Sequence, residues 1–160
     1  MTDANISPIT SDQLLKHWQG HRALTRRVID AFPENDLFNY SIGGMRKMSD
    51  YALEFLGMAV PTLQGITTGV WPEGDKGDKP QTKADILKAW DETTEDINRL
   101  WPKIAPERWQ QVDKAFGQWE MPVYSLVQYI IDNEVHHRGQ GYVYLRALGI
   151  EPPPFYEREF

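Results

Sequence analysis

The chain has 160 residues, a length that suits one domain over residues 1–160 with its own hydrophobic core. It contains no cysteine, which excludes disulfides, thiolate metal sites and cysteine nucleophiles and is typical of a reducing compartment. A formal net charge of −6 and a pI near 5.2 argue against general nucleic-acid binding, which needs clustered lysine and arginine, so no nucleic-acid partner is expected.

The first predicted helix covers residues 11–32. Thr10 and Gln13 have the spacing of a capping box at its start, and Pro33 marks its end. The residues before it lack the basic and apolar segments of a signal peptide, which predicts a cytoplasmic protein. Residues at helical spacing form the stripe that is expected to face the core: Leu14, Trp18, His21, Thr25, Val28 and Phe32.

The second predicted helix covers residues 48–68. It belongs to the longest weakly charged stretch of the chain, residues 51–71, in which Glu54 is the only charged residue. Pro61 and several polar residues in this stretch favour a buried bundle helix over a membrane span. No membrane association is therefore expected.

A long connection and a third helix follow. Residues 69–81 are rich in glycine, proline and aspartate, which predicts a mobile loop whose tip is accessible to proteases. Thr82 is expected to cap a helix that runs to about Leu100, with an acidic, solvated outer face. Four apolar residues of this segment are expected to face the core: Ile86, Trp90, Ile97 and Trp101.

The last third of the chain contains one long helical pattern. Residues 106–121 predict a short helix followed by an extended turn, and the final helix is expected from about Pro122 to Leu148, before Gly149. Four long amphipathic segments joined by turn-rich connections predict an all-α fold, a four-helix bundle.

Two polar residues lie on the stripe of the last helix that is expected to face the core. That stripe consists of Leu126, Ile130, Asn133, His137, Gly141, Tyr144 and Leu148. A buried polar group without a partner costs about 1 to 3 kcal/mol, so Asn133 and His137 require a metal, a ligand or a hydrogen-bond network. They lie one turn apart and could share a metal, for which imidazole is the better ligand. Two core polar residues satisfied by neighbouring groups are the alternative.

Glu54 also has two interpretations. Its carboxylate could reach solvent from the edge of the bundle, or it could complete a carboxylate–imidazole metal site with His137. The nearby sequence Asn-Glu-Val-His-His, residues 133–137, is one residue away from the His-Glu-x-x-His motif of zinc proteases. Asn133 replaces the first histidine of that motif, and the missing ligand argues against a protease.

The other histidines offer a rival site. His17 and His21 are four residues apart on the first predicted helix, so they could form a second metal-binding pair. Their surroundings are more polar than those of the last helix, which makes this pair the weaker candidate. His136 is turned about 100° from His137 and is expected at the surface, at an interface or beside the site.

Several segments resemble the DinB family, also described as DinB/YfiT-like. The resemblance rests on residues 136–140 (His-His-Arg-Gly-Gln) and residues 142–153, with support from residues 25–33 and 48–50. It implies a four-helix bundle of up-down-down-up connectivity that is often a homodimer. It also implies a metal held by three histidines, one on the second helix and two on the fourth.

His137 matches one of these three histidines, whereas Asn133 and Glu54 stand at the other two positions. The resemblance thus implies Glu54, Asn133 and His137 as ligands of Ni, Zn, Fe or Mn, with weaker binding than by three imidazoles. It further implies a metal-dependent transferase or hydrolase acting on a small-molecule substrate, with a low-molecular-weight thiol as cosubstrate in some relatives. The alternative is a non-catalytic, stress-associated or ligand-binding bundle with a degenerate metal site. No catalytic residue is assigned.

Overall fold

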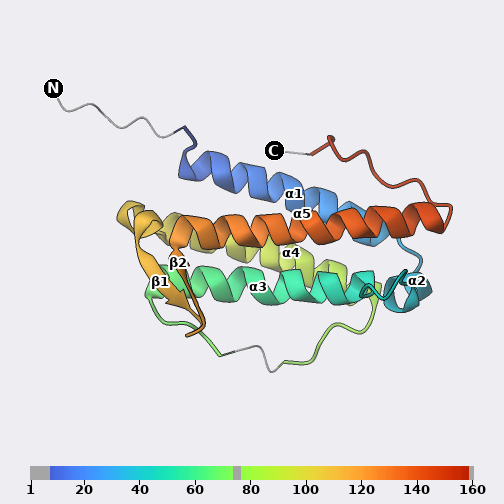
Figure 1. Ribbon diagram of the computed structural model, residues 1–160, viewed down its shortest axis with the longest axis horizontal. Helices are drawn as coiled ribbons and strands as arrows, with labels where there is room; N and C mark the ends of the chain where they lie inside the picture. The colour runs from blue at the N-terminus through green and yellow to red at the C-terminus, as the bar shows by residue number, and fades with distance from the viewer. Residues whose placement is uncertain (1–7, 74–76, 159–160) are drawn as a thin grey trace.

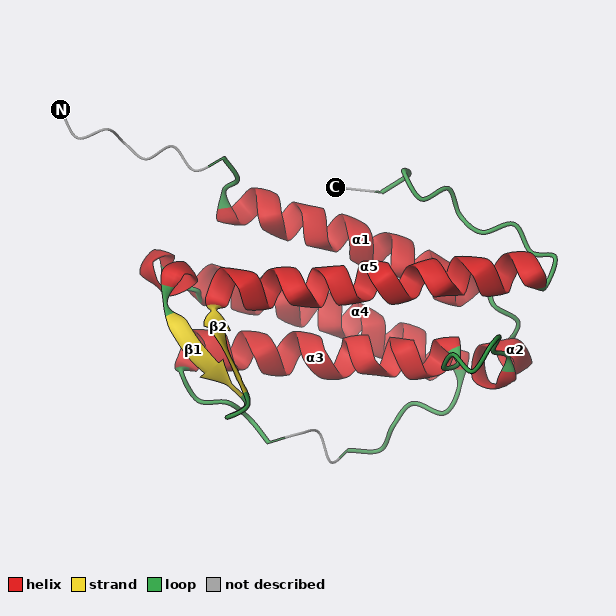
Figure 2. Cartoon of the chain, viewed as in Figure 1, coloured by secondary structure: helices red, strands yellow, loops and turns green. Residues whose placement is uncertain are grey.

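The computed structural model describes residues 8–73 and 77–158. Within them, four long helices form a bundle and a two-stranded antiparallel sheet lies at one end of it (Figures 1 and 2). The long helices are α1 (Ser11–Ala31), α3 (Met48–Thr68), α4 (Lys83–Leu100) and α5 (Val123–Ala147). The shorter elements are α2 (Glu34–Asn39), η1 (Trp101–Lys103), η2 (Pro106–Gln110), β1 (Val112–Ala115) and β2 (Trp119–Pro122).

The helices have up-down-down-up connectivity, as predicted. In Figure 1, α1 and α5 run in one direction, and α3 and α4 run in the opposite direction. The connection between α3 and α4 explains this order, because residues 69–73 leave one end of the bundle and residues 77–82 lead to the other end, where α4 begins. The tip of the connection, residues 74–76, lies outside the described residues, so its predicted mobility and protease sensitivity stay predictions. In the described part of the chain, no helix is both long and apolar enough to cross a membrane.

Local capping interactions determine where the helices begin and end. The backbone N–H of Gln13 donates to Thr10 Oγ1 at 3.2 Å, and the N–H of Thr10 donates to Gln13 Oε1 at 2.9 Å, which confirms the capping box. Thr82 caps α4 by accepting from the N–H of Asp85 at 3.1 Å. Gly69 ends α3 with a φ of 73°, a conformation that glycine adopts without strain. These local signals explain why the helix boundaries agree with the sequence.

Residues 106–121 contain the predicted short helical segment, as the 3₁₀ helix η2, but a β-hairpin takes the place of the predicted extended turn. The 3₁₀ helix η2 is followed by strands β1 and β2, which pair through a turn with left-handed backbone at Phe116 (φ 52°) and Gly117 (φ 68°). Arg108 Nε donates to the carbonyl of Ile66 at 2.9 Å and ties this segment to the end of α3. Each strand has only four residues, too few for an alternating pattern to distinguish it from a turn.

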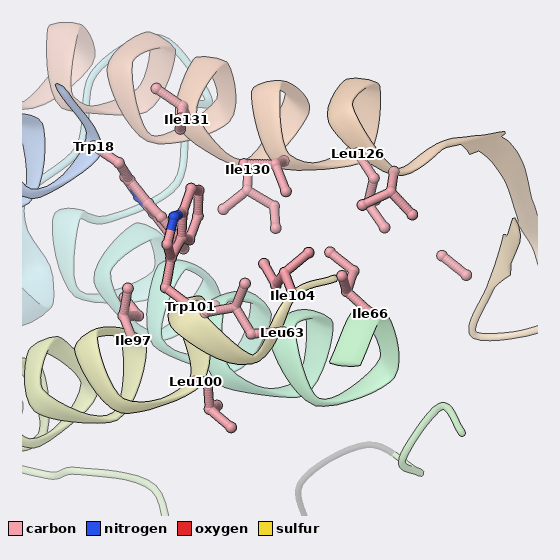
Figure 3. Packing of buried hydrophobic residues seen from close by; sticks show 14 residues of the cluster. Trp18, Leu63, Ile66, Ile97, Leu100, Trp101, Ile104, Leu126, Ile130 and Ile131 are labelled. Carbon is pink, nitrogen blue, oxygen red and sulfur yellow. The ribbon is translucent and has the colours of Figure 1, made fainter. Parts of the chain in front are cut away.

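Two clusters of buried apolar side chains fill the bundle. The first lies near the hairpin, where the rings of Trp18 and Trp101 pack with centroids 5.9 Å apart (Figure 3). The second lies toward α2 and includes Phe55 and Trp90, whose ring centroids are 6.3 Å apart. The four residues predicted to face the core from the third helical segment are all buried: Ile86, Trp90, Ile97 and Trp101.

Gly65 offers a test of the packing between α3 and the connection that follows it. The Trp71 ring lies where a side-chain carbon on residue 65 would be placed. We expect Gly65→Ala to lower the free energy of unfolding by about 1 to 3 kcal/mol, because the ring must move. Gly57→Ala on the same helix is the matched control, since no atom lies within 4 Å of its added carbon, and it is expected to be neutral or stabilising. Chemical denaturation compares the two, and equal stabilities would contradict the contact.

Candidate functional site

The three side chains predicted as metal ligands lie together between α3 and α5. Glu54 comes from α3, and Asn133 and His137 come from α5. Asn133 Nδ2 donates to Glu54 Oε1 at 2.9 Å, and His137 Nε2 lies 3.8 Å from the same oxygen. The side chains of Glu54 and His137 are 28% and 16% exposed, so the group lies at the edge of the bundle interior.

Neighbouring side chains orient the His137 ring. Its Nδ1 lies 2.6 Å from Gln140 Oε1. An amide oxygen only accepts hydrogen bonds, so Nδ1 carries the proton in this contact and Nε2 of the neutral ring keeps its lone pair. Tyr51 stacks on the ring, with centroids 4.3 Å apart and planes 15° from parallel. The Nε2 lone pair therefore faces the Glu54 carboxylate.

Arg46 is a fourth member of the site, which no sequence motif indicated. Its Nη1 lies 2.5 Å from Glu54 Oε2, and its Nη2 lies 3.4 Å from His137 Nε2. The guanidinium also lies 4.6 Å from the centre of the Tyr51 ring. The backbone of Arg46 is held on both sides, because its N–H donates to the Tyr51 hydroxyl at 3.2 Å and its carbonyl accepts from the Tyr144 hydroxyl at 2.7 Å.

These contacts favour the ionised form of Glu54. Partial burial acts to raise the pKa of Glu54, but the hydrogen bonds from Arg46 and Asn133 and the charge of Arg46 outweigh it, so this pKa lies below its usual value. The hydrogen bond to Glu54 in turn raises the pKa of Arg46. The site therefore holds one carboxylate charge that is balanced by one guanidinium charge.

Glu54 and His137 lie near the spacing that ligands of a divalent metal ion require. Metal–ligand bonds of about 2.1 Å place neighbouring ligand atoms roughly 3 to 3.6 Å apart. The distance from Glu54 Oε1 to His137 Nε2, 3.8 Å, is slightly above that range. Asn133 donates through Nδ2 to Glu54, so its amide would have to turn before its oxygen could serve as a third ligand. Within residues 8–73 and 77–158 no group of three or more His, Cys, Asp or Glu residues is placed to hold a metal ion.

A cavity of about 730 Å³ opens beside Glu54 and Arg46, between α3 and α4. This volume is in the range of small-molecule sites. Asn133 and His137 do not line the cavity, so a ligand in it would approach the site from the side of Glu54 and Arg46. The carboxylates along its wall belong to Asp50, Glu54, Asp78, Glu92 and Asp96.

The rival pair of histidines lies beside two arginines that contact His21. The rings of His17 and His21 are 4.5 Å apart on α1. Arg138 Nη2 lies 3.0 Å from His21 Nδ1, and Arg158 Nη1 lies 3.2 Å from His21 Nε2. Burial, followed by the charges of Arg138, His17 and Arg158, lowers the pKa of His21 to about 3. This arrangement opposes a metal ion at His21. His136 is exposed, and its ring packs edge-on against the His137 ring, with centroids 4.8 Å apart.

Glu134 faces α1 and does not belong to the candidate metal site. It is 1% exposed and accepts a hydrogen bond of 2.6 Å from Thr25 Oγ1. Burial raises the pKa of Glu134, whereas the charges of Arg22 and Arg138 act in the opposite direction. Both arginines are buried. We call Glu134, Thr25, Arg22 and Arg138 the buried charge cluster, a group that sequence reasoning missed although Thr25 lies on the predicted inward stripe.

Comparisons with known proteins agree with this architecture. The Bacillus subtilis (strain 168) protein named "Uncharacterized protein YjoA" is 24% identical over 155 residues, which are 92% of this chain and 97% of that protein. The crystal structure of the DinB-like protein YjoA from Bacillus subtilis has a TM-score of 0.74 at 18% identity and covers 92% of this chain and 99% of that one.

A second crystal structure, of a DinB-like protein from Bacillus cereus ATCC 10987, has a TM-score of 0.72 at 20% identity. It covers 91% of this chain and 97% of its own. At these identities the solved structures show a common fold. The sequence profile described as the DinB family matches residues 1–160, and the chain therefore belongs to the DinB family.

Proposed function

We propose that the protein binds a divalent metal ion through Glu54, Asn133 and His137 and acts on a small molecule as a metal-dependent transferase or hydrolase. The orientation of His137 carries this proposal. Because Nδ1 is engaged with Gln140, the Nε2 lone pair and Glu54 Oε1 face each other as two acceptors 3.8 Å apart. Two facing acceptors repel unless a cation lies between or beside them. In this structure the guanidinium of Arg46 is that cation, 3.4 Å from His137 Nε2, and we propose that a metal ion can take the same place.

The ligand set suits a borderline metal that is held less firmly than by three imidazoles. One imidazole, one carboxylate and one amide are compatible with Ni, Zn, Fe or Mn and leave coordination positions for water or substrate. When bound, such an ion acts as a Lewis acid and lowers the pKa of a bound water or thiol. Gln140 and Tyr51 fix the imidazole ring, and the cavity beside Glu54 has room for a small substrate.

The proposed substrate class is inferred from the family resemblance and not from a contact in the structure. A low-molecular-weight thiol is the cosubstrate that we propose, and a molecule of that class would fit the cavity of about 730 Å³. A homodimer and a cytoplasmic location stay predictions.

A non-catalytic, ligand-binding or stress-associated bundle is the second candidate. The Arg46 contact favours it, because Nη1 of Arg46 lies 2.5 Å from Glu54 Oε2 and already neutralises the carboxylate. Asn133 Nδ2 donates to the other carboxylate oxygen. In this alternative, hydrogen bonds alone satisfy the polar residues, and metal has no role.

Metal content distinguishes the two candidates. Untagged protein would be incubated with Ni, Zn, Fe or Mn, freed of unbound metal by gel filtration and analysed by elemental mass spectrometry. We expect about one ion per chain in the wild type, and less than a tenth of that in His137→Ala, which lacks the imidazole ligand. His136→Ala, which removes the adjacent exposed imidazole, is the matched control and should bind like the wild type.

Thermal denaturation adds an independent reading. An ion at 100 times its dissociation constant stabilises the folded state by about 2.7 kcal/mol, so a chelator should lower the Tm of the metal-loaded wild type but not that of His137→Ala. Equal, negligible metal in both proteins and a Tm that does not respond to the chelator would support the non-catalytic alternative.

A further inference from the structure

Resting on the metal site proposed above, we infer that Arg46 competes with the metal ion for Glu54 and His137. In this account the guanidinium occupies the site when no metal is bound, and metal binding requires Arg46 to leave. Arg46 therefore lowers the affinity of the site for metal, and metal occupancy depends on the position of the Arg46 side chain.

The contacts of Arg46 are those that a cation in the site would make. One arm of its guanidinium lies 2.5 Å from Glu54 Oε2, and the other lies 3.4 Å from His137 Nε2. The planar guanidinium is suited to two acceptors side by side, and here the second acceptor is an imidazole nitrogen. A divalent ion would use the same carboxylate and the same lone pair. The two cations would repel each other at such short range, so they exclude one another.

The three groups differ in how easily they can move. Glu54 and His137 project from long helices, and their side chains are 28% and 16% exposed. Arg46 lies in the segment before α3, and its side chain is 47% exposed. Tyr51 and Tyr144 hold its backbone N–H and carbonyl. The side chain can therefore turn away while the backbone stays in place.

The adjacent cavity offers the displaced guanidinium an alternative position. Arg46 already lines this cavity of about 730 Å³. Asp50 on α3 and Glu92 and Asp96 on α4 also line it, and their carboxylates attract a positive charge. After Arg46 leaves Glu54, its guanidinium would therefore still lie near other carboxylates.

Titration calorimetry with Ni²⁺ tests the competition directly. We expect Arg46→Gln to bind Ni²⁺ about tenfold more tightly than the wild type, because the ion no longer has to break a charge-assisted hydrogen bond. Arg46→Lys keeps the positive charge and is expected to stay close to the wild type. Arg26→Gln is the matched control, since it removes another partly exposed arginine, which pairs with Asp91 at 2.6 Å between α1 and α4. The Ni²⁺ affinity of this variant should not change.

The double variant Arg46→Gln/His137→Ala separates this inference from the proposal on which it rests. Tighter binding in Arg46→Gln that is lost in the double variant supports the competition. Equal affinities in the wild type and Arg46→Gln, both lost with His137→Ala, would overturn the role of Arg46 and leave the metal site standing. Weaker binding in Arg46→Gln would also overturn it. No binding by any of the proteins would overturn the metal site itself, and the competition with it.

Discussion

Glu134→Ala is expected to lower the free energy of unfolding by about 3 to 5 kcal/mol, because it leaves buried arginines without their counter-charge. Glu134 is 1% exposed, and Arg22 and Arg138 are 1% and 5% exposed. Thr25 would also lose the oxygen to which it donates at 2.6 Å. Among the described residues, Nε and Nη1 of Arg22 have no hydrogen-bond partner. Hydrogen bonds therefore stabilise the buried charge of Arg22 only in part, and nearby negative charge has to supply the rest.

Two further variants separate the charge of Glu134 from its packing. Glu134→Gln keeps the size of the side chain and an acceptor for Thr25, so it should cost less than alanine. Asp132→Ala removes an exposed carboxylate from the same helix and should leave the stability nearly unchanged. Urea denaturation measures all three. If Glu134→Ala were as stable as Asp132→Ala, the buried charge cluster would not contribute as the structure indicates.

The second large effect is a loss of stability as the pH falls from about 6.5 toward 3. Burial and the nearby arginines lower the pKa of His21 from 6.5 to about 3. Between these values the unfolded chain binds a proton at His21 and the folded chain does not, so lower pH favours unfolding. The free energy of unfolding should fall by up to about 1.4 kcal/mol per pH unit from this one group. His17, whose pKa is also lowered, contributes with the same sign.

His21→Gln isolates this contribution. Glutamine can still accept a hydrogen bond from Arg138, but it has no proton to gain in this pH range. Carboxylates with lowered pKa values, such as Glu54, also lose stabilisation at low pH, and they do so in both proteins. We therefore expect urea denaturation at a series of pH values to show a flatter dependence for His21→Gln, with His136→Gln following the wild type. Parallel curves for His21→Gln and the wild type would refute the assignment.

Local sequence signals account for most of the fold. The capping residues Thr10 and Thr82 and the left-handed Gly69 mark helix ends through contacts within a few residues, and such contacts can be recognised without a structure. The hairpin could not be predicted in the same way. Its strands have four residues each, and their position depends on a long-range contact from Arg108 to the end of α3.

The candidate site was predictable only in part. Asn133 and His137 were conspicuous as polar residues on an apolar stripe, and Glu54 as a lone charge, because their helices have a regular period. Arg46 lies in an irregular segment where no periodicity tells which way a side chain points, and its partner Glu54 is eight residues away. For the same reason the sequence did not predict the contact of Arg158, in the C-terminal segment, with His21. Loop residues that complete a helical site can be identified only from three-dimensional contacts.

Anomalous X-ray diffraction from crystals grown with Ni²⁺ tests most directly whether Glu54, Asn133 and His137 hold one metal ion, as we propose. We predict one anomalous peak about 2.0 to 2.2 Å from a Glu54 carboxylate oxygen, from His137 Nε2 and from the Asn133 amide oxygen, with Arg46 turned away from Glu54. A map without a peak between these side chains, with Arg46 still bonded to Glu54, would contradict the claim.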